Sequence, residues 1–176
     1  MKFAETILRG AFVIEIESIE DERGFFARTF CRQEFEAHGL NPDLAQCSIS
    51  FNRRKGTLRG MHYQVKPHEE AKVVWCIAGA IHDVIIDLRP ASPTFKRWHA
   101  VELKAGTHRM VYVPEGVAHG FQTLKDDTVV FYQISEFHDA TFARGVRWDD
   151  RAFRIVWPES PSTISERDRS YPDFSA

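Results

Sequence analysis

The most informative stretch of this chain is Gly56-Thr57-Leu58-Arg59-Gly60-Met61-His62-Tyr63-Gln64, because it locates potentially reactive side chains on a predicted β-strand. It is patterned like a β-strand, yet it holds a guanidinium and an imidazole, and Lys72 follows ten residues after His62. Side chains alternate between the two faces of a strand, so a regular strand would place Arg59 and His62 on opposite faces. We expect Gly60, between them, to host a β-bulge that turns one toward the other.

Segments of the same character recur along most of the chain. Each is short, rich in β-branched or aromatic residues, and bounded by Gly, Pro, Asp or Asn, which predicts β-strands. The expected strands are residues 12–16, 25–30, 46–51, 57–64, 72–78, 80–88, 98–103, 109–113, 120–124 and 128–134. Their regular spacing is typical of a sandwich or barrel of the jelly-roll type.

Two segments depart from the strand pattern. A helix is expected over residues 32–38, ended by Gly39. Residues 151–176, with a turn at residues 165–168, are expected to fold back over the barrel as a partly helical segment. The prediction is therefore one all-β domain over residues 1–176 with short peripheral helices.

Composition argues against several functional classes. The chain is 43% hydrophobic and 27% charged, and its net charge of −2 gives no electrostatic basis for binding nucleic acid or an anionic membrane. Apolar runs such as residues 73–78 are too short to cross a bilayer, and residues 1–5 lack the apolar core of a signal peptide. Cys31, Cys47 and Cys76 have no CxxC spacing and are interpreted as reduced thiols, so we expect a cytoplasmic protein.

Three side chains are candidates for acid–base chemistry, each with a structural alternative. His62 among cations is expected to stay neutral and act as a base, although most strand histidines are structural. Lys72 is either a charge on the surface of a strand or a group that stabilises an oxyanion. Tyr132 shares a face with Val130 and Ile134, so it is either a core tyrosine or a proton donor.

The sequence does not favour a metal centre. His119 lies in a Pro-x-Gly-x-x-His pattern that resembles half of the metal-binding motif of cupins, whose other half is His-x-His followed by Glu. Tyrosine and glutamine follow His62, and the turn residues His68, Glu69 and Glu70 have the wrong spacing. No glycine-rich phosphate loop and no Gly-x-Ser-x-Gly elbow occurs. We therefore expect no metal and no other cofactor.

Ordered motifs extend over nearly the whole chain. The two signatures are Leu58-Arg59-Gly60-Met61-His62 and Pro114-Glu115-Gly116-Val117-Ala118-His119-Gly120-Phe121. The others are Asp21-Glu22-Arg23-Gly24-Phe25-Phe26, residues 83–89, Ser92-Pro93-Thr94-Phe95, Phe131-Tyr132, Trp148-Asp149-Asp150, Trp157-Pro158 and Ile164-Ser165-Glu166-Arg167-Asp168. Together they resemble the dTDP-4-dehydrorhamnose 3,5-epimerase family, sugar-nucleotide epimerases built on a cupin-type jelly roll, the double-stranded β-helix.

The resemblance implies an isomerase that inverts C3, C5 or both in a nucleoside-diphosphate-4-keto-6-deoxyhexose. The leading reaction is dTDP-4-dehydro-6-deoxyglucose to dTDP-4-dehydrorhamnose, in the biosynthesis of dTDP-rhamnose and polysaccharides. By this match His62 removes the proton next to the ketone and is oriented by Asp168. Asp83 is the fallback for that orienting role, because it precedes Val84 in a strand expected to cross the same cavity. Lys72 would stabilise the enolate, and Tyr132 would return a proton to the opposite face.

The resemblance also implies a substrate-binding set and a homodimer. Arg23 and Arg59 would contact the diphosphate. The other expected binding residues are Phe26, Arg28, Gln46, Ser48, His119, His138 and Arg167. An N-terminal strand would join the partner's sheet and cover an edge strand such as residues 12–16, so that Arg23, Phe25 and Arg28 reach the partner's site.

Several positions depart from the family's pattern and leave the nucleotide base, the sugar and the number of inverted centres open. They are Arg28 for a glutamate, Ser48 for an asparagine, Gln133 for a lysine, Phe137-His138 for two tyrosines, Ala143 for a glutamate and Arg167 for a lysine. The alternatives are an epimerase for C3 only or for another nucleotide, a metal-dependent cupin enzyme, and a non-catalytic sugar-binding cupin. Bound iron, manganese or zinc would mark the metal enzyme, and a lack of proton exchange with solvent would mark the binding protein.

Overall fold

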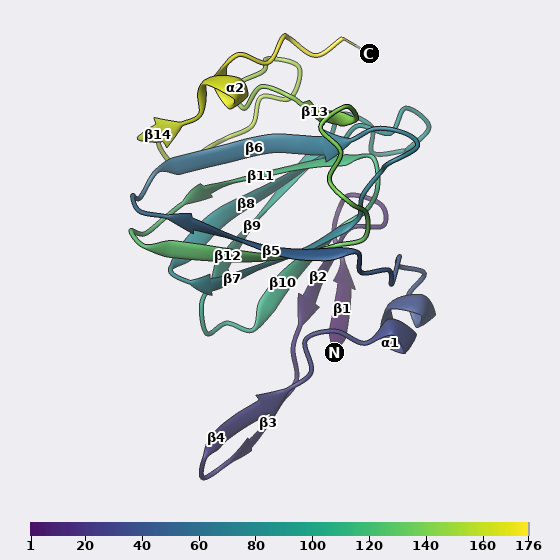
Figure 1. Ribbon diagram of the computed structural model, residues 1–176, viewed down its shortest axis with the longest axis vertical. Coiled ribbons are helices and arrows are strands. Elements are labelled where there is room, and N and C mark those ends of the chain that lie inside the picture. The colour runs from purple at the N-terminus through teal and green to yellow at the C-terminus, as the bar shows by residue number, and fades with distance from the viewer. Residues whose placement is uncertain (176) are drawn as a thin grey trace.

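The computed structural model describes residues 1–175, which form two β-sheets packed face to face (Figure 1). The first, here called the β12 sheet, has the order β1 (Lys2–Glu5), β2 (Phe12–Glu15), β10 (Arg109–Val113), β7 (Lys72–Ala78), β12 (Thr128–Ile134) and β5 (Gln46–Asn52). The second, the β6 sheet, has the order β13 (Ala143–Gly145), β6 (Thr57–Gln64), β11 (Val117–Thr123), β8 (Ala80–Asp87) and β9 (Trp98–Lys104), and β14 (Thr163–Ile164) pairs with β6 in parallel. The expected all-β jelly roll is confirmed.

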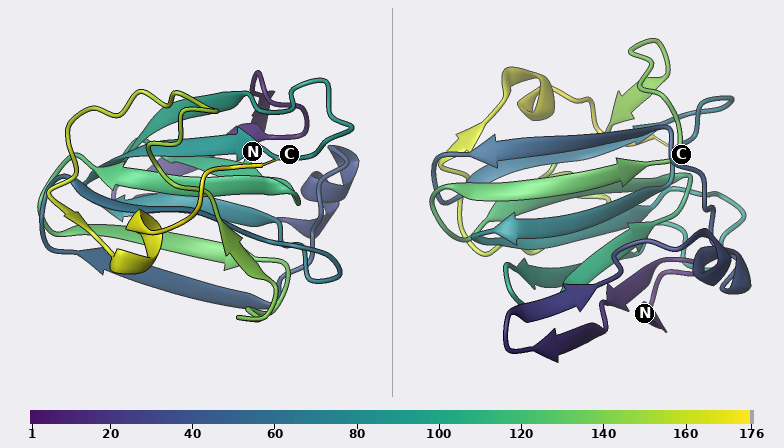
Figure 2. Two further views of the ribbon diagram at one scale, coloured as in Figure 1. Left: turned by 90° about the horizontal axis from the view of Figure 1, so that it is seen from above. Right: turned by 60° about the horizontal axis from the view of Figure 1, so that its bottom comes forward.

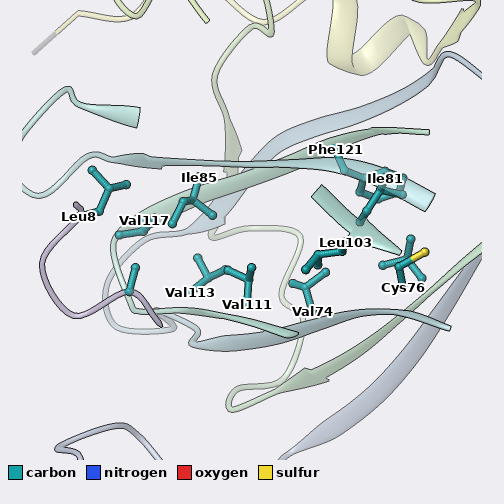
Figure 3. Packing of buried hydrophobic residues seen from close by; sticks show 12 residues of the cluster. Leu8, Val74, Cys76, Ile81, Ile85, Leu103, Val111, Val113, Val117 and Phe121 are labelled. Atoms are coloured by element: carbon teal, nitrogen blue, oxygen red, sulfur yellow. The ribbon is translucent and has the colours of Figure 1, made fainter. Parts of the chain in front are cut away.

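The space between the two sheets is filled mainly by aliphatic side chains. Val74 and Val111 of the β12 sheet and Ile81 and Ile85 of the β6 sheet are at most 2% exposed, and Figure 3 shows them between the facing strands. Burying one such side chain stabilises the fold by about 1.5–3 kcal/mol. This core fixes the separation of the sheets and hence the width of the cavity between them.

A β-bulge interrupts the pairing of β6 with β11 at the position expected from the sequence. His62 is opposite His119 and Arg59 is opposite Phe121, so β6 has one more residue than β11 in this interval. Gly60 has a φ of +127°, which only glycine adopts readily. A Cβ at Gly60 would lie 2.5 Å from the Cα of Gly120, so the two strands approach each other too closely for a side chain. The bulge turns both Arg59 and His62 into one pocket, which confirms the prediction.

Two segments lie outside the sandwich (Figure 2). The hairpin of β3 (Ser18–Asp21) and β4 (Gly24–Ala27) extends away from the body, and α1 (Arg32–Ala37) follows it along the chain. The C-terminal segment covers the outer face of the β6 sheet, where Val146, Phe153 and Trp157 pack against Val84 and Ile86. Among the described residues, neither helix is long and apolar enough to cross a membrane.

The structure corrects three expectations. The segment 12–16 is not an edge strand, because β2 pairs with β1 on one side and with β10 on the other. Residues 165–168 are not a simple turn: Ser165 caps α2 (Glu166–Arg169) by accepting a hydrogen bond from the amide of Asp168. The strand expected at 25–30 ends at Ala27, before α1 begins.

Candidate active site

A cavity of about 310 Å³ opens between the two sheets, at the bulge of β6. Its walls come from both sheets: β6 and β11 contribute His62 and His119, and β7 and β12 contribute Lys72 and Tyr132. The other lining residues are Gln46, Ser48, Ser50, Arg59, Tyr63, Gln64, Glu70, Phe121, Ile134, His138, Ala143, Arg144 and Arg167. His62, His119, Lys72 and Tyr132 thus meet in one cavity although they come from four different strands.

His62 is held by Asp168, as the resemblance implied. Its Nε2 lies 2.6 Å from Oδ1 of Asp168, and the other carboxylate oxygen accepts the amide N–H of Gly60 at 3.2 Å. Burial alone would raise the pKa of the Asp168 carboxyl, but the hydrogen bonds from His62, Gly60 and Ser165 outweigh it and hold that pKa below its ordinary value. A carboxylate on Nε2 fixes the ring's orientation and leaves Nδ1 as the nitrogen that can exchange a proton in the cavity.

Tyr132 stands on the opposite sheet from His62. Its hydroxyl is 3.2 Å from Oγ of Ser50, and burial raises the pKa of the phenol above its ordinary value of 10.0, with the Ser50 bond only partly offsetting this. The phenol therefore keeps its proton at neutral pH and can donate it. A substrate between the sheets would have the imidazole on one side and the phenol on the other.

Lys72 carries an ion pair that sequence reasoning missed. Its ammonium lies 2.6 Å from Oε1 of Glu70, and both side chains are about nine-tenths buried. The sequence indicates for Glu70 only a turn position with the wrong spacing for a metal ligand. Its separation of two residues from Lys72 was the available signal, because residues at i and i+2 of an extended segment lie on one face.

His119 has its own carboxylate partner in Asp83. The Nε2–Oδ2 distance is 2.7 Å, both side chains are at most 5% exposed, and the other oxygen of Asp83 has no partner among the described residues. Asp83, the fallback for orienting His62, therefore pairs with a different imidazole. Since His119 and His62 are cross-strand neighbours, two histidine–carboxylate pairs stand side by side in the cavity wall.

The arginines of the cavity contact neutral groups. Arg59 donates from Nε to Oδ1 of Asn52 at 2.7 Å, and Arg167 donates from Nε to the hydroxyl of Tyr171 at 2.8 Å. Arg144 donates to the backbone carbonyls of Thr141 and Ala143. Their positive charges are thus available to an anion at the mouth of the cavity. Asn52, which fixes the guanidinium of Arg59, was also missed by sequence reasoning.

The remaining expected binding residues divide into two groups. Gln46, Ser48 and His138 line the cavity, where the amide of His138 donates to Oε1 of Gln46 at 3.2 Å. The other group, Arg23, Phe26 and Arg28, lies on or just after the β3–β4 hairpin and does not line the cavity of its own chain. Arg23 pairs with Asp21 of the hairpin, and Arg28 pairs with Glu34 of α1.

No group of three or more His, Cys, Asp or Glu residues within residues 1–175 is arranged to hold a metal ion. His62 and His119 each have a carboxylate partner on Nε2, and Glu70 is engaged by Lys72. The chemistry available in the cavity is that of a base, an acid and a cation.

Comparison with known proteins relates this arrangement to a family. Residues 5–176 match the family model described as dTDP-4-dehydrorhamnose 3,5-epimerase. A dTDP-4-dehydrorhamnose 3,5-epimerase of Shigella flexneri is 37% identical over 169 residues, which cover 96% of this chain and 93% of that protein. The crystal structure of the Bacillus anthracis protein of the same name, with TDP and PPi bound, matches with a TM-score of 0.94 and 38% identity over 98% of this chain and 99% of that one.

A further match is to ChmJ, a 3′-monoepimerase from Streptomyces bikiniensis. That structure, in complex with dTDP, has a TM-score of 0.87 and 31% identity and covers 96% of this chain and 85% of the other. It is a double mutant in which a histidine and a tyrosine are replaced. The separation of these two positions along the ChmJ chain equals that of His62 and Tyr132.

Proposed function

The chain belongs to the dTDP-4-dehydrorhamnose 3,5-epimerase family and is a sugar-nucleotide isomerase, and we propose that the His62–Asp168 pair and Tyr132 are its base and its acid. The substrate is a 4-keto-6-deoxy sugar nucleotide. The observation that carries the proposal is the placement of the imidazole and the phenol on facing sheets of one cavity. Inverting a carbon centre requires that a proton leave one face and another arrive at the opposite face.

The first step is removal of the hydrogen on the carbon next to the ketone. Nδ1 of His62 takes the proton, the C–H electron pair becomes the carbon–carbon double bond, and the ketone oxygen becomes an enolate. The resulting imidazolium is stabilised by Asp168, whose lowered pKa keeps it anionic. The Lys72 ammonium stabilises the enolate oxygen.

The second step returns a proton from the other side. The Tyr132 hydroxyl protonates the carbon: the electron pair of the carbon–carbon double bond forms the new C–H bond, and a pair on the enolate oxygen re-forms the ketone. The phenolate recovers its proton from solvent by way of the Ser50 hydroxyl, and the His62 imidazolium releases its proton to solvent. Because the raised pKa of Tyr132 makes the phenolate costly, its reprotonation is strongly favoured. The cycle is redox-neutral, so the reaction needs no oxidant or reductant.

The substrate's diphosphate binds at the mouth of the cavity. Arg59 and Arg167 are exposed cations with neutral partners, suited to charge-assisted bonds to phosphate. Gln46, Ser48 and His138 then receive the nucleoside. Thymidine is the leading base because the name of the family model and the TDP of the Bacillus relative point to it. Equal or tighter binding of guanosine or cytidine diphosphate in calorimetry would contradict this assignment.

The active form is a homodimer in which the β3–β4 hairpin completes the partner's cavity. Phe26 and Ile19 of this hairpin are 74% and 73% exposed, which is unusual for large apolar side chains. Ile49 and Phe51 on the outer side of edge strand β5 are also exposed. Burial of these surfaces between two copies would bring Arg23, Phe26 and Arg28 to the diphosphate and base of the partner's substrate.

Mixing two inactive variants tests this arrangement. Arg23→Ala removes the hairpin's contact and His62→Ala removes the base. In a mixed dimer with shared sites, the His62→Ala chain supplies an intact hairpin to the cavity of the Arg23→Ala chain, which still has its His62. Random pairing then completes about a quarter of all sites, and activity returns on mixing. If each chain uses its own hairpin, mixing restores nothing, and a stable monomer in light scattering would likewise contradict the dimer.

A second candidate is inversion at C3 alone, which the similarity to the 3′-monoepimerase ChmJ favours. A panel of nucleoside-diphosphate-4-keto-6-deoxy sugars in deuterated water, followed by NMR, decides between them. A 3,5-epimerase introduces deuterium at C3 and C5 and yields the product inverted at both, whereas a C3 epimerase labels and inverts only C3. Label at neither carbon would favour a non-catalytic sugar-binding protein, and activity that follows bound iron, manganese or zinc in elemental analysis would favour a metal enzyme.

The place of action that fits these features is the cytoplasm, where sugar nucleotides are made and thiols stay reduced. All three cysteines are free, which supports this location. Separating cytoplasmic and secreted fractions of expressing cells would test it. We place the activity in rhamnose biosynthesis, because the names of the family model and of the relatives contain 4-dehydrorhamnose.

A further inference from the structure

The cations of the cavity differ in how their charge is balanced. The part of the cavity next to Lys72 is here called its buried end, because the Lys72 side chain is only 10% exposed, and there the carboxylate of Glu70 lies 2.6 Å from the Lys72 ammonium. Arg59, Arg144 and Arg167 are exposed and, within the part of the chain described, donate only to amide, carbonyl or hydroxyl groups. At the buried end, the Lys72–Glu70 pair has no net charge. At the open end, no carboxylate of residues 1–175 balances the charges of the arginines.

We propose that Glu70 determines which end of the substrate enters the cavity. By cancelling the charge of Lys72, it keeps the buried end for the neutral keto sugar and leaves the diphosphate to the arginines. The inference rests on the proposed function, because it takes Lys72 as the group that meets the ketone oxygen. Glu70 is in this sense a specificity-determining residue, a role distinct from those of the base and the acid.

The physical reason is the strength of charge interactions away from water. An unpaired ammonium at the buried end would attract the most highly charged anion in reach, because attraction is weakly screened there. A diphosphate seated on Lys72 would hold the substrate in reverse, with the sugar outside. The Glu70 carboxylate adds a repulsion against such an anion at the same point.

The pair does not prevent Lys72 from serving the reaction. An ammonium has three N–H donors, and Glu70 engages one, so the others remain for the ketone oxygen. The enolate carries one negative charge spread over carbon and oxygen and exists only during turnover, whereas a diphosphate carries at least two charges throughout. Glu70 therefore disfavours a bound diphosphate more than it disfavours the enolate.

The test measures binding of inorganic pyrophosphate by calorimetry, which requires no turnover. Glu70→Gln keeps an oxygen acceptor for Lys72 and removes only the charge. We expect this variant to bind pyrophosphate at least tenfold more tightly than the unaltered protein, or to gain a second pyrophosphate per chain. Glu69→Gln is the matched control: it makes the same substitution one residue away, outside the cavity lining, and should bind like the unaltered protein.

Two further variants locate the effect. Adding Lys72→Gln to Glu70→Gln should remove the gain, whereas adding Arg59→Ala should leave most of it. If Glu70→Gln fails to fold, Glu70→Asp, which withdraws the carboxylate by one methylene, should show a smaller gain over the unaltered protein. Pyrophosphate binding by the Glu70 variants no tighter than by Glu69→Gln would overturn the inference. That result would leave the proposed epimerase intact, because loss of solvent exchange in His62→Ala tests the base separately.

Discussion

The Nε2 atom of His62 lies 2.6 Å from the Asp168 carboxylate, although 106 positions of sequence separate the two residues. The same carboxylate accepts the amide of Gly60, so one acidic side chain ties the C-terminal helix to both the imidazole and the bulge that aims it. The helix is itself capped by Ser165. The C-terminal segment is therefore part of the proposed catalytic arrangement as well as a cover for the β6 sheet.

Replacing Asp168 with Asn should slow proton abstraction and leave binding of dTDP unchanged. Asparagine can either accept from or donate to Nε2, so the imidazole is no longer held in one tautomer, and its cationic form loses a partner. We expect exchange of the α-hydrogen to fall by at least about tenfold. NMR exchange rates and calorimetric affinities for dTDP provide the two readouts. A matching loss in affinity would indicate that Asp168 shapes the binding site instead.

Tyr132→Phe should separate exchange from inversion. The ring and its packing remain, but the donor is lost, while His62 can still remove and return a proton on its own face. Deuterium should therefore enter the substrate with retained configuration while the inverted product fails to form. Product stereochemistry by NMR checks this outcome. Normal inversion by Tyr132→Phe would mean that another group, or water, supplies the second proton.

Gly60→Ala should damage the site by moving the bulge. The added Cβ would meet Gly120 at 2.5 Å, and the φ of +127° is also strained for alanine. Gly24 is the matched control, because its φ of +125° is nearly the same but no atom lies within 4 Å of an added Cβ. Gly60→Ala should lower the free energy of unfolding by about 1–3 kcal/mol more than Gly24→Ala. Chemical denaturation measures both, and equal costs would show that β6 and β11 can separate freely.

Features that depend on residues close in sequence could be predicted from the sequence alone, whereas contacts between residues far apart in sequence could not. Local patterns predicted most strands. The bulge at Gly60 was predicted because a regular strand would place Arg59 and His62 on opposite faces. The pairing of β2 with β1 was missed because a four-residue strand gives little local signal. The His62–Asp168 pair came only from the family resemblance, since nothing local links a strand to a distant helix. The Glu70–Lys72 ion pair was not predicted, because Glu70 lies in a Pro-containing turn and the sequence does not show that it shares a face with Lys72.

The tyrosines should titrate late in the native protein. Burial raises the pKa of all four phenols, that of Tyr112 to about 12, with Tyr63, Tyr132 and Tyr171 shifted in the same direction. Absorbance at 295 nm should therefore rise at higher pH than in the denatured chain, whose phenols ionise near about 10. A raised native pKa contributes stability that is complete below the unfolded pKa and is lost as pH rises through the native one. The denaturant concentration at the midpoint of unfolding should therefore decrease as the pH rises above about 10. A titration curve of the native protein that coincides with that of the denatured chain would refute the raised pKa values.

The whole proposed mechanism depends on His62 as the base that removes the proton next to the ketone. Its most direct test is solvent deuterium entry into a dTDP-4-keto-6-deoxy sugar, followed by NMR with the His62→Ala protein. We expect that exchange is abolished and that turnover falls by roughly two to four powers of ten, the usual contribution of a positioned acid or base. Exchange by His62→Ala at the rate of the unaltered protein would contradict the assignment of the base and the mechanism built on it.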